Sequence, residues 1–429
     1  MEASVNSSNG GSAPGLPDTG IESLHGFDPA HTNYATLFVD ALLRLAKSAG
    51  VSDVHLQPTA NGLDIRWRLD GVLQAVGVFP AGETADVVTR LKVLAELLTY
   101  QTDVPQEGRI RDSAGSQAVE MRVSTFPTVF GERAVVRLFN SGGEFVAIDQ
   151  LGLPDAAVRQ LDGLLRETSG ALLVTGPAGS GKTTTAYASL RHLVELTAGG
   201  RSIVSLEDPV EVIVPGVAQS QTSAAAGFEL HAGLKSLLRQ DPEVIFVGEI
   251  RDRATAEVAF QAALTGQLMV TTFHAGSAAE AVSRLSDMGL EPYVLRSALL
   301  GIVSQRLVRR LCECAIPASE PAEFAGLPLS FAKVPVGCAK CRQTGYLGRT
   351  VLAELLVNVR DVVGRAITTG VEASQIEALA VTDGMIPLWD HALAAIAAGV
   401  TSPAEVRRVF GLRTASACSA DDAGRAGAP

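Results

Sequence analysis

The chain has 429 residues, of which 47% are hydrophobic and 19% are charged, and its net charge is −11. This composition predicts a globular protein of two or three domains, and the acidic balance argues against broad electrostatic capture of nucleic acid. No run approaches the roughly eighteen apolar residues of a membrane-spanning helix, and the first residues do not have the pattern of a secretory signal. Five cysteines in a chain of this length do not indicate a disulfide framework, so we expect a cytoplasmic protein.

The N-terminal third predicts a small α+β domain after an unstructured start. Residues 1–32 are rich in Gly, Ser, Pro and Asn and predict a disordered lead-in. The domain itself is expected over 33–145, with Ser141–Glu144 as a linker at its end. Its expected helices cover 34–49 and 83–98, and its expected strands cover 53–56, 63–69, 72–78, 119–124 and 133–139.

From about residue 150 the pattern changes to helices that alternate with apolar strands. Such alternation predicts an α/β fold, with a mostly parallel sheet covered by helices on both faces. This second domain is expected over 150–410. Beyond Pro292 the sequence predicts mainly helix, interrupted by a cysteine-containing insertion at 312–349, and residues 415–429 predict a disordered tail. The four expected core strands are 171–175, 202–206, 244–247 and 268–272.

The segment that follows the first of these strands is a complete phosphate loop, Gly-x-x-x-x-Gly-Lys-Thr, from Gly176 to Thr183. A strand before it and a helix after it are the context that this motif requires. Backbone N–H groups of the glycines and the helix N-terminus attract a polyphosphate. Lys182 is expected to reach the β- and γ-phosphates, and the Thr183 hydroxyl to bind Mg²⁺. The expected nucleotide-binding residues of the loop are Gly176, Gly179, Ser180, Gly181, Lys182, Thr183 and Thr184.

Three polar residues follow other core strands, where open α/β sheets place their ligands. Glu249 ends the run Val-Ile-Phe-Val-Gly-Glu and fits a residue that orders the magnesium shell or its water. Glu207 fits a general base for the attacking water, although a turn acid before proline is an equal alternative. His274 fits a γ-phosphate sensor, and a solvated or capping histidine is the other interpretation.

The motifs together resemble the type II secretion and type IV pilus assembly ATPases. Residues 237–252 are similar to the Walker B signature of that family, 203–211 to its aspartate box and 265–274 to its histidine box. Four boxes in the family's order are far more specific than a phosphate loop alone. Further matches lie at 52–55, 68–71, 105–109, 122–127, 131–133, 305–312 and 344–349, so that the resemblance covers roughly residues 35–410.

The resemblance implies a RecA-like P-loop NTPase core preceded by a smaller α+β, PAS-like domain. It also implies a Mg²⁺-dependent, ATP-hydrolysing hexamer, peripheral at the inner membrane, that works with a membrane platform protein and needs no nucleic acid. ATP would lie between the two domains, where Arg122 and Arg137 match the family's charge-compensating arginines. Glu207 becomes the expected water-activating carboxylate and Glu249 the Walker B acid, and Arg239 is an expected nucleotide-binding residue.

Three departures from the family pattern are visible. The first histidine of the histidine box is Gln267, and an arginine near the Walker B run is Lys235, which keeps the charge but loses the bidentate fork. The long N-terminal docking region of many assembly ATPases is not expected here. A nucleotide-binding regulatory subunit without turnover therefore stays open as an alternative, as does a nucleic-acid motor built on the same core.

The cysteines leave two interpretations open. Assembly-type members often carry Cys-x-x-Cys twice as a structural zinc site, and Cys338 and Cys341 have that spacing. Cys312 and Cys314 are one residue short of it. A Cys₄ zinc site remains expected because zinc requires a tetrahedral geometry rather than a fixed spacing. Free thiols are the alternative, and Cys418 lies in the expected tail.

Overall fold

The computed structural model describes residues 21–82, 86–111, 120–138, 147–223, 226–357 and 361–411. The chain forms two compact units. One contains Met1–Glu144 with Val336–Leu347, and the other contains Phe145–Pro335 with Gly348–Pro429. The linker predicted at 141–144 and the tail predicted at 415–429 lie outside the described residues, and so do the first twenty residues.

The N-terminal unit is a six-stranded sheet in the order β3-β2-β1-β6-β5-β4, with two helices against one face. Alternate residues such as Val54, Ile65 and Val136 are fully buried beneath the helices, because successive side chains of a strand point to opposite faces. The elements are α1 (Tyr34–Ser48), β1 (Asp53–Thr59), β2 (Gly62–Leu69), β3 (Val72–Phe79), α2 (Val87–Leu94), β4 (Gln106–Arg111), β5 (Glu120–Thr128) and β6 (Gly131–Leu138).

The prediction of a disordered lead-in over 1–32 is wrong from residue 21 onward. Ile21–Gly26 is a 3-10 helix, η1, in which the side chain of Leu24 is only 1% exposed. The ring of His25 stacks on Phe79, with 4.5 Å between ring centroids. A composition-based prediction missed this segment because one leucine and one ring supply its contacts with the core.

The C-terminal unit is built on a seven-stranded sheet in the order β15-β12-β7-β11-β10-β8-β9. The pairs β12–β7, β7–β11, β11–β10, β10–β8 and β8–β9 are all parallel, so the predicted α/β class is confirmed. The strands are β7 (Gly170–Thr175), β8 (Ile203–Glu207), β9 (Ala218–Gln221), β10 (Val244–Val247), β11 (Leu268–Phe273), β12 (Leu299–Leu311) and β15 (Tyr346–Leu356), and a small hairpin pairs β13 (Ile316–Pro317) with β14 (Lys333–Val334).

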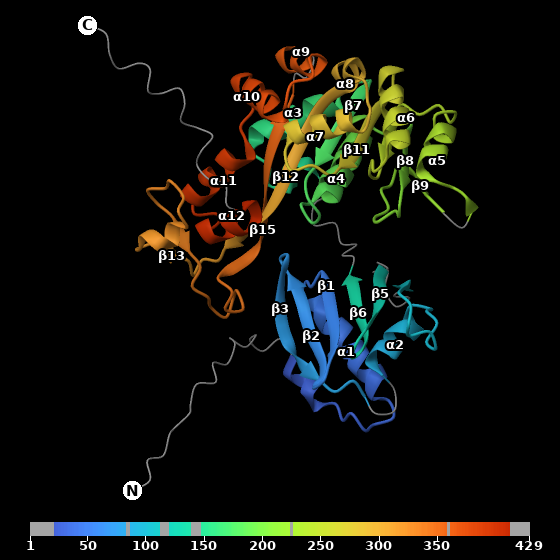
Figure 1. The fold of residues 1–429 in the computed structure, drawn as a ribbon, viewed down its shortest axis with the longest axis vertical. Helices are drawn as coiled ribbons and strands as arrows, with labels where there is room; N and C mark the ends of the chain where they lie inside the picture. The colour runs from blue at the N-terminus through green and yellow to red at the C-terminus, as the bar shows by residue number, and fades with distance from the viewer. Residues whose placement is uncertain are drawn as a thin grey trace. The chain divides into compact units, whose positions relative to one another are not determined.

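Helices cover both faces of this sheet (Figure 1). Leu172 packs with the residues of α4 on one face, whereas Leu173 packs with those of α6 and α7 on the other. β7 is therefore buried along its whole length, as expected for the centre of a parallel sheet. The helices are α3 (Asp155–Leu165), α4 (Lys182–Leu196), α5 (Leu230–Leu237), α6 (Arg253–Leu264), α7 (Ala278–Asp287), α8 (Pro292–Ala298), α9 (Val362–Thr368), α10 (Ala373–Thr382), α11 (Leu388–Ala397) and α12 (Pro403–Phe410), with 3-10 helices η2 (Ile148–Leu151) and η4 (Pro321–Phe324).

The expectation of mainly helix beyond Pro292 is wrong for two long strands. β12 pairs in parallel with β7, with Ile302 opposite Leu173, and β15 is its other neighbour in the sheet. A short apolar run fits a buried strand or a buried helix equally well by periodicity alone. Pairing with β7, which lies more than a hundred residues earlier, decides the structure of this segment.

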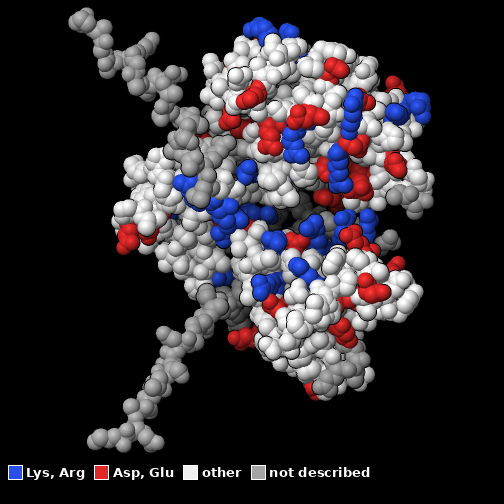
Figure 2. All heavy atoms as spheres, in the orientation of Figure 1, with Lys and Arg blue, Asp and Glu red and all other residues white. Residues whose placement is uncertain are grey.

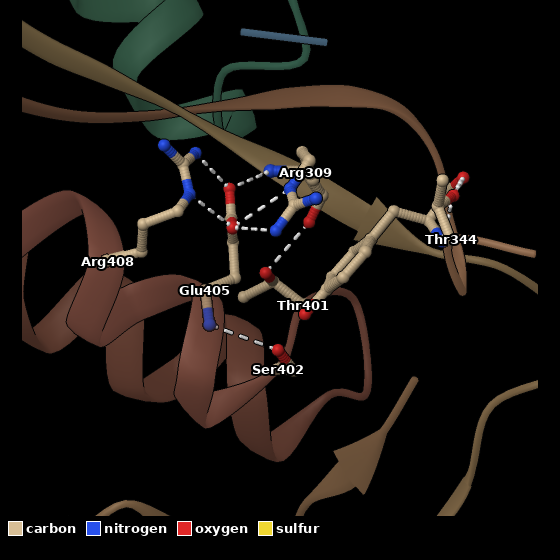
Figure 3. Close-up of polar contacts among 7 residues, drawn as sticks. Arg309, Thr344, Thr401, Ser402, Glu405 and Arg408 are labelled. Atoms are coloured by element: carbon tan, nitrogen blue, oxygen red, sulfur yellow. Dashed lines mark hydrogen bonds and ion pairs between the residues drawn. The ribbon is translucent and has the colours of Figure 1, made fainter. Parts of the chain in front are cut away.

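A buried carboxylate joins the last helix to β12 (Figure 3). The side chain of Glu405 is fully buried, and its carboxylate accepts hydrogen bonds from the guanidinium groups of Arg309 and Arg408 and from the backbone N–H of Arg309. Ser402 caps α12 by accepting a hydrogen bond from the Glu405 N–H at 3.1 Å. Burial alone raises the pKa of Glu405, but the hydrogen bonds from the two arginines outweigh it and lower the pKa to about 2.

Replacing Glu405 with glutamine is expected to lower the free energy of unfolding by roughly 3 kcal/mol at pH 7, because Arg309 loses its buried counter-charge. An unperturbed glutamate has a pKa of about 4.3 in the unfolded chain. The native pKa is lower, so the stabilisation is present above the unfolded pKa and is lost as the pH falls toward about 2. The measurement is the thermal unfolding midpoint of wild type and of Glu405→Gln at pH 7 and at pH 3.

The matched control is Arg408→Gln, since the Arg408 side chain is 43% exposed and that of Arg309 only 15%. Its midpoint should fall by less than that of Glu405→Gln. Two results would contradict the stabilising role of the Glu405 carboxylate. One is an equal fall of the thermal midpoint in both variants, and the other is a difference in midpoint between Glu405→Gln and wild type that does not shrink at pH 3.

Both signs of charge lie on the C-terminal unit. Figure 2 shows acidic and basic side chains interspersed over the helices at the top of the view, so the face drawn there carries no field of a single sign. Among the described residues, no helix is both long enough and apolar enough to cross a bilayer.

Candidate functional site

The phosphate loop lies between β7 and α4, as the sequence predicts. Gly176, Gly179 and Gly181 have φ angles of +149°, +74° and +89°, which L side chains rarely adopt. A Cβ at Gly176 would lie 2.4 Å from Ser180 Oγ, so no side chain fits there. Two further residues predicted to bind nucleotide lie in the first turn of α4, where Thr183 is half-buried and Thr184 is exposed. Strand, loop and helix together leave a helix N-terminus open to an anion.

Lys182, the first residue of α4, bends over its own loop. Its Nζ donates hydrogen bonds to the carbonyl oxygens of Gly176 at 2.8 Å and Pro177 at 3.1 Å, and lies 3.5 Å from His274 Nδ1. Burial lowers the pKa of Lys182, and the negative charge of Glu249 opposes this shift. The ammonium group is thus held at the mouth of the loop, and phosphate oxygens would replace the two carbonyls as its acceptors.

Glu249 and His274 lie beside this lysine. Glu249 follows β10 and His274 follows β11, and because these strands are parallel neighbours, their carboxyl ends meet at one edge of the sheet. His274 Nε2 lies 2.7 Å from Glu249 Oε1, and Arg251 Nε donates to the other carboxylate oxygen. The Glu249 side chain is 16% exposed, so its carboxylate still reaches solvent. His274 therefore lies between Lys182 and Glu249 and contacts both of them beside the loop.

Glu207 ends β8 at the same edge but is more enclosed. It is 2% exposed, and both of its carboxylate oxygens accept hydrogen bonds. Ser205 Oγ donates at 2.6 Å and Gln219 Nε2 at 3.0 Å to one oxygen, and the Tyr187 hydroxyl donates to the other. Burial raises the pKa of Tyr187, and its hydrogen bond to Glu207 raises it further. In this structure Glu207 is therefore a fixed acceptor within a buried network.

Sequence reasoning missed the partners of Glu207. Tyr187 lies in the helix after the phosphate loop and Gln219 on the edge strand β9, so neither is close in sequence to the acid that it contacts. The one local signal is Ser205, a polar residue inside an apolar strand, two positions before Glu207 and on the same face.

Three residues singled out in the sequence make none of these contacts. They are Gln267 and Lys235, which depart from the family pattern, and Arg239, which is predicted to bind nucleotide. Gln267 immediately precedes β11, at the end of the strand opposite to His274, and its side chain accepts a hydrogen bond from Thr265. Lys235 is exposed in α5. Arg239, just after α5, donates to the Lys235 carbonyl and to Ser236 Oγ, both at 3.2 Å. Its role in binding nucleotide stays a prediction.

Arg122 and Arg137 lie in the N-terminal unit, directly opposite each other on the neighbouring strands β5 and β6. Arg137 Nε donates to Asp53 Oδ1 at 2.9 Å, and the Arg137 side chain is 59% exposed. Asp53 itself is buried and also lies 3.5 Å from Arg68 Nε. The two arginines are thus brought together on one face of the sheet, and their role in charge compensation stays a prediction.

The four cysteines of the insertion converge. The Sγ atoms of Cys312, Cys314, Cys338 and Cys341 all lie within 4.8 Å of one another, and those of Cys338 and Cys341 are 3.7 Å apart. Backbone N–H groups of Cys338 and Gly345 donate to Cys341 Sγ, at 3.1 and 3.2 Å. Thiolates around a tetrahedral zinc are about 3.8 Å apart at Zn–S distances of about 2.3 Å, so this donor set fits such an ion.

Comparison with known proteins identifies relatives over most of the chain. The family model described as type II/IV secretion system protein matches residues 30–408. The type II secretion system protein E of Klebsiella pneumoniae is 42% identical over 386 residues, which cover 89% of this chain and 76% of that protein. The type IV pilus assembly ATPase PilB of Thermus thermophilus is 38% identical over 381 residues. These cover 87% of this chain, which spans only 42% of the length of the Thermus protein.

Solved structures agree on the fold. The crystal structure of the ATPase DotB from Yersinia pseudotuberculosis superposes with a TM-score of 0.66 over 89% of this chain and 95% of that chain, at 18% identity. At this identity the likeness shows the fold alone, and it confirms the α/β class with a RecA-like core. The family model and the relatives near 40% identity, which are named as secretion and pilus assembly ATPases, show more than the fold: this chain belongs to the type II/IV secretion system protein family.

Proposed function

We propose that this protein is a Mg²⁺-dependent ATPase that powers the assembly of a type IV pilus or of a type II secretion pseudopilus. The observation that carries the proposal is the convergence of Lys182, His274 and Glu249 at the phosphate loop, in a chain of this family. A loop of inward-facing N–H groups, a lysine and a partly exposed carboxylate are the parts from which phosphoryl transfer to water is built.

Each residue has a proposed part in the reaction. Lys182 exchanges its two carbonyl acceptors for phosphate oxygens, and the Thr183 hydroxyl and Glu249 hold the hydrated Mg²⁺, which neutralises phosphate charge when bound. Glu249 is open to solvent and accepts from His274, so it is also placed to orient the attacking water. Glu207 is the other candidate for that role, and its enclosure by Tyr187 favours Glu249.

The assembly and location are proposed from the family. We propose a homo-hexamer, as expected for ATPases of this family, which acts in the cytoplasm at the inner membrane with a platform protein of the pilus or secretion machine. Arg122 and Arg137 compensate phosphate charge during the cycle. We expect no nucleic-acid partner, because a net charge of −11 argues against broad electrostatic capture of DNA. A regulatory subunit without turnover is the alternative, although Gln267 lies at the far end of its strand from His274.

One experiment decides between motor and regulatory subunit. Steady-state phosphate release by the purified full chain is measured with Mg²⁺ and ATP, with and without single-stranded DNA, together with light scattering on the eluted protein. Turnover by a hexamer, without stimulation by DNA, supports the proposal. Binding of ATP without phosphate release overturns it in favour of the regulatory subunit, and strong stimulation by DNA overturns it in favour of a nucleic-acid motor.

We further propose that the four cysteines bind one zinc ion, which cross-links the two ends of the insertion. Zinc content measured by elemental analysis is expected to be about one ion per chain, and Cys338→Ser is expected to lose it and to lower the thermal midpoint. Cys418→Ser, in the sequence tail, is the matched control and should keep the metal. Equal midpoints with and without a strong chelator would contradict a structural zinc.

A further inference from the structure

The buried side chain of Gln305, on β12, is hydrogen-bonded to the phosphate loop. This residue is 1% exposed and lies 125 positions after Ser180. Its amide Nε2 donates to the Ser180 carbonyl oxygen at 2.8 Å, and its Oε1 accepts from Thr185 Oγ1 at 2.9 Å. Both ends of the amide are used, one on the loop and one on the first turns of α4, so the orientation of the side chain is fixed.

The contact with Ser180 determines where the next N–H group points. In a planar trans peptide the C=O and N–H groups point in opposite directions. The Ser180 carbonyl points to Gln305, and therefore the N–H of Gly181, which lies in the same peptide plane, points in the opposite direction, away from Gln305. An N–H in that position is one of the donors with which a phosphate loop binds its anion.

The glycines of the loop approach the same residue. A Cβ at Gly176 would lie 2.4 Å from the backbone oxygen of Gln305, and a Cβ at Gly181 would lie 3.1 Å from its Nε2. The loop therefore packs directly on Gln305, which leaves it little freedom to turn its peptides. The two contacts need a donor and an acceptor at the end of one side chain on β12, and the amide of Gln305 supplies both.

We propose that Gln305 is a positioning residue for nucleotide binding, which fixes the Ser180–Gly181 peptide so that the Gly181 N–H faces the phosphates. This inference rests on the proposed function and names a part of its binding site. It predicts that the donor end of the amide matters for nucleotide affinity, whereas the acceptor end, on Thr185, matters for stability only.

The test compares Gln305→Glu, Gln305→Met and Thr185→Val with wild type. Glutamate keeps the shape and still accepts from Thr185, but it turns a second acceptor toward the Ser180 carbonyl, and methionine fills the space with no donor. The dissociation constant of a fluorescent, non-hydrolysable ATP analogue should rise roughly tenfold or more in both Gln305 variants. Thr185→Val keeps the donor end and should change it less than about threefold, while lowering the thermal midpoint.

The outcomes separate this inference from the proposed function. If wild type does not bind the analogue, the proposed function and the inference about Gln305 are both wrong. If wild type binds it and the Gln305 variants bind equally well, or lose no more affinity than Thr185→Val, then Gln305 only packs β12 against α4 and the inference is wrong. Should Gln305→Glu fail to fold, Gln305→Met decides alone, since it introduces no repulsion.

Discussion

Replacing Lys182 with alanine is expected to reduce ATP hydrolysis by about a hundredfold or more, because a desolvated ammonium that contacts two phosphates is worth several kcal/mol in the transition state. Two other basic side chains at the site, His274 and Arg251, are both paired with Glu249. The measurement is phosphate release at saturating ATP, beside binding of the analogue.

The matched control for this variant is Lys47→Ala, which removes an exposed lysine from the last turn of α1. It should leave turnover unchanged. Turnover by Lys182→Ala at a rate close to that of wild type would show that hydrolysis does not depend on the phosphate loop, and the proposed function would fail with it.

Glu249→Gln is expected to bind ATP and to hydrolyse it about 10² to 10³ times more slowly than wild type, since a neutral amide neither orders a metal shell nor accepts a proton. Its partner experiment is Glu207→Gln, which keeps only one acceptor oxygen and turns an amide N–H₂ group either toward Tyr187 or toward Ser205 and Gln219. We expect that variant to lose thermal stability and to keep more activity than Glu249→Gln.

The comparison has a clear opposite outcome. A Glu207→Gln protein that folds, binds ATP and does not turn over, beside a Glu249→Gln protein that retains measurable activity, would assign water activation to Glu207. That result would also indicate that the network of Tyr187, Ser205 and Gln219 opens when nucleotide binds, because in the present structure Glu207 is buried and both of its oxygens accept hydrogen bonds from this network.

The parts of the site that the sequence predicts are those whose signal is local. The phosphate loop has fixed spacing, and β8, β10 and β11 are short β-branched runs, each with a predicted site residue at or just beyond the end of the strand. The parts that it missed depend on distant partners. Gln305 meets Ser180 across 125 positions and β12 is a strand only because β7 accepts it, so no window of sequence contains either fact.

The same limit holds at the end of the chain. Ser402-Pro-Ala-Glu405 has the spacing of a capping box, in which the glutamate would bond back to the helix start. The serine does cap α12, but the carboxylate of Glu405 turns to Arg309 on β12 instead. The local motif accounts for the helix start, and the positive charge of Arg309, distant in sequence, accounts for the direction of the Glu405 carboxylate.

The strand order has a consequence for how this protein is made. β7, which is buried along its whole length, is the first strand of its sheet to leave the ribosome, yet its neighbours β11 and β12 begin only at Leu268 and Leu299. At about 5 to 20 residues per second, roughly 6 to 25 s pass before β12 follows. Both edges of Gly170–Thr175 stay unpaired until β11 is made, and the edge that β12 covers stays unpaired for the whole interval, so translation speed and chaperone supply set how much of the newly made protein escapes aggregation.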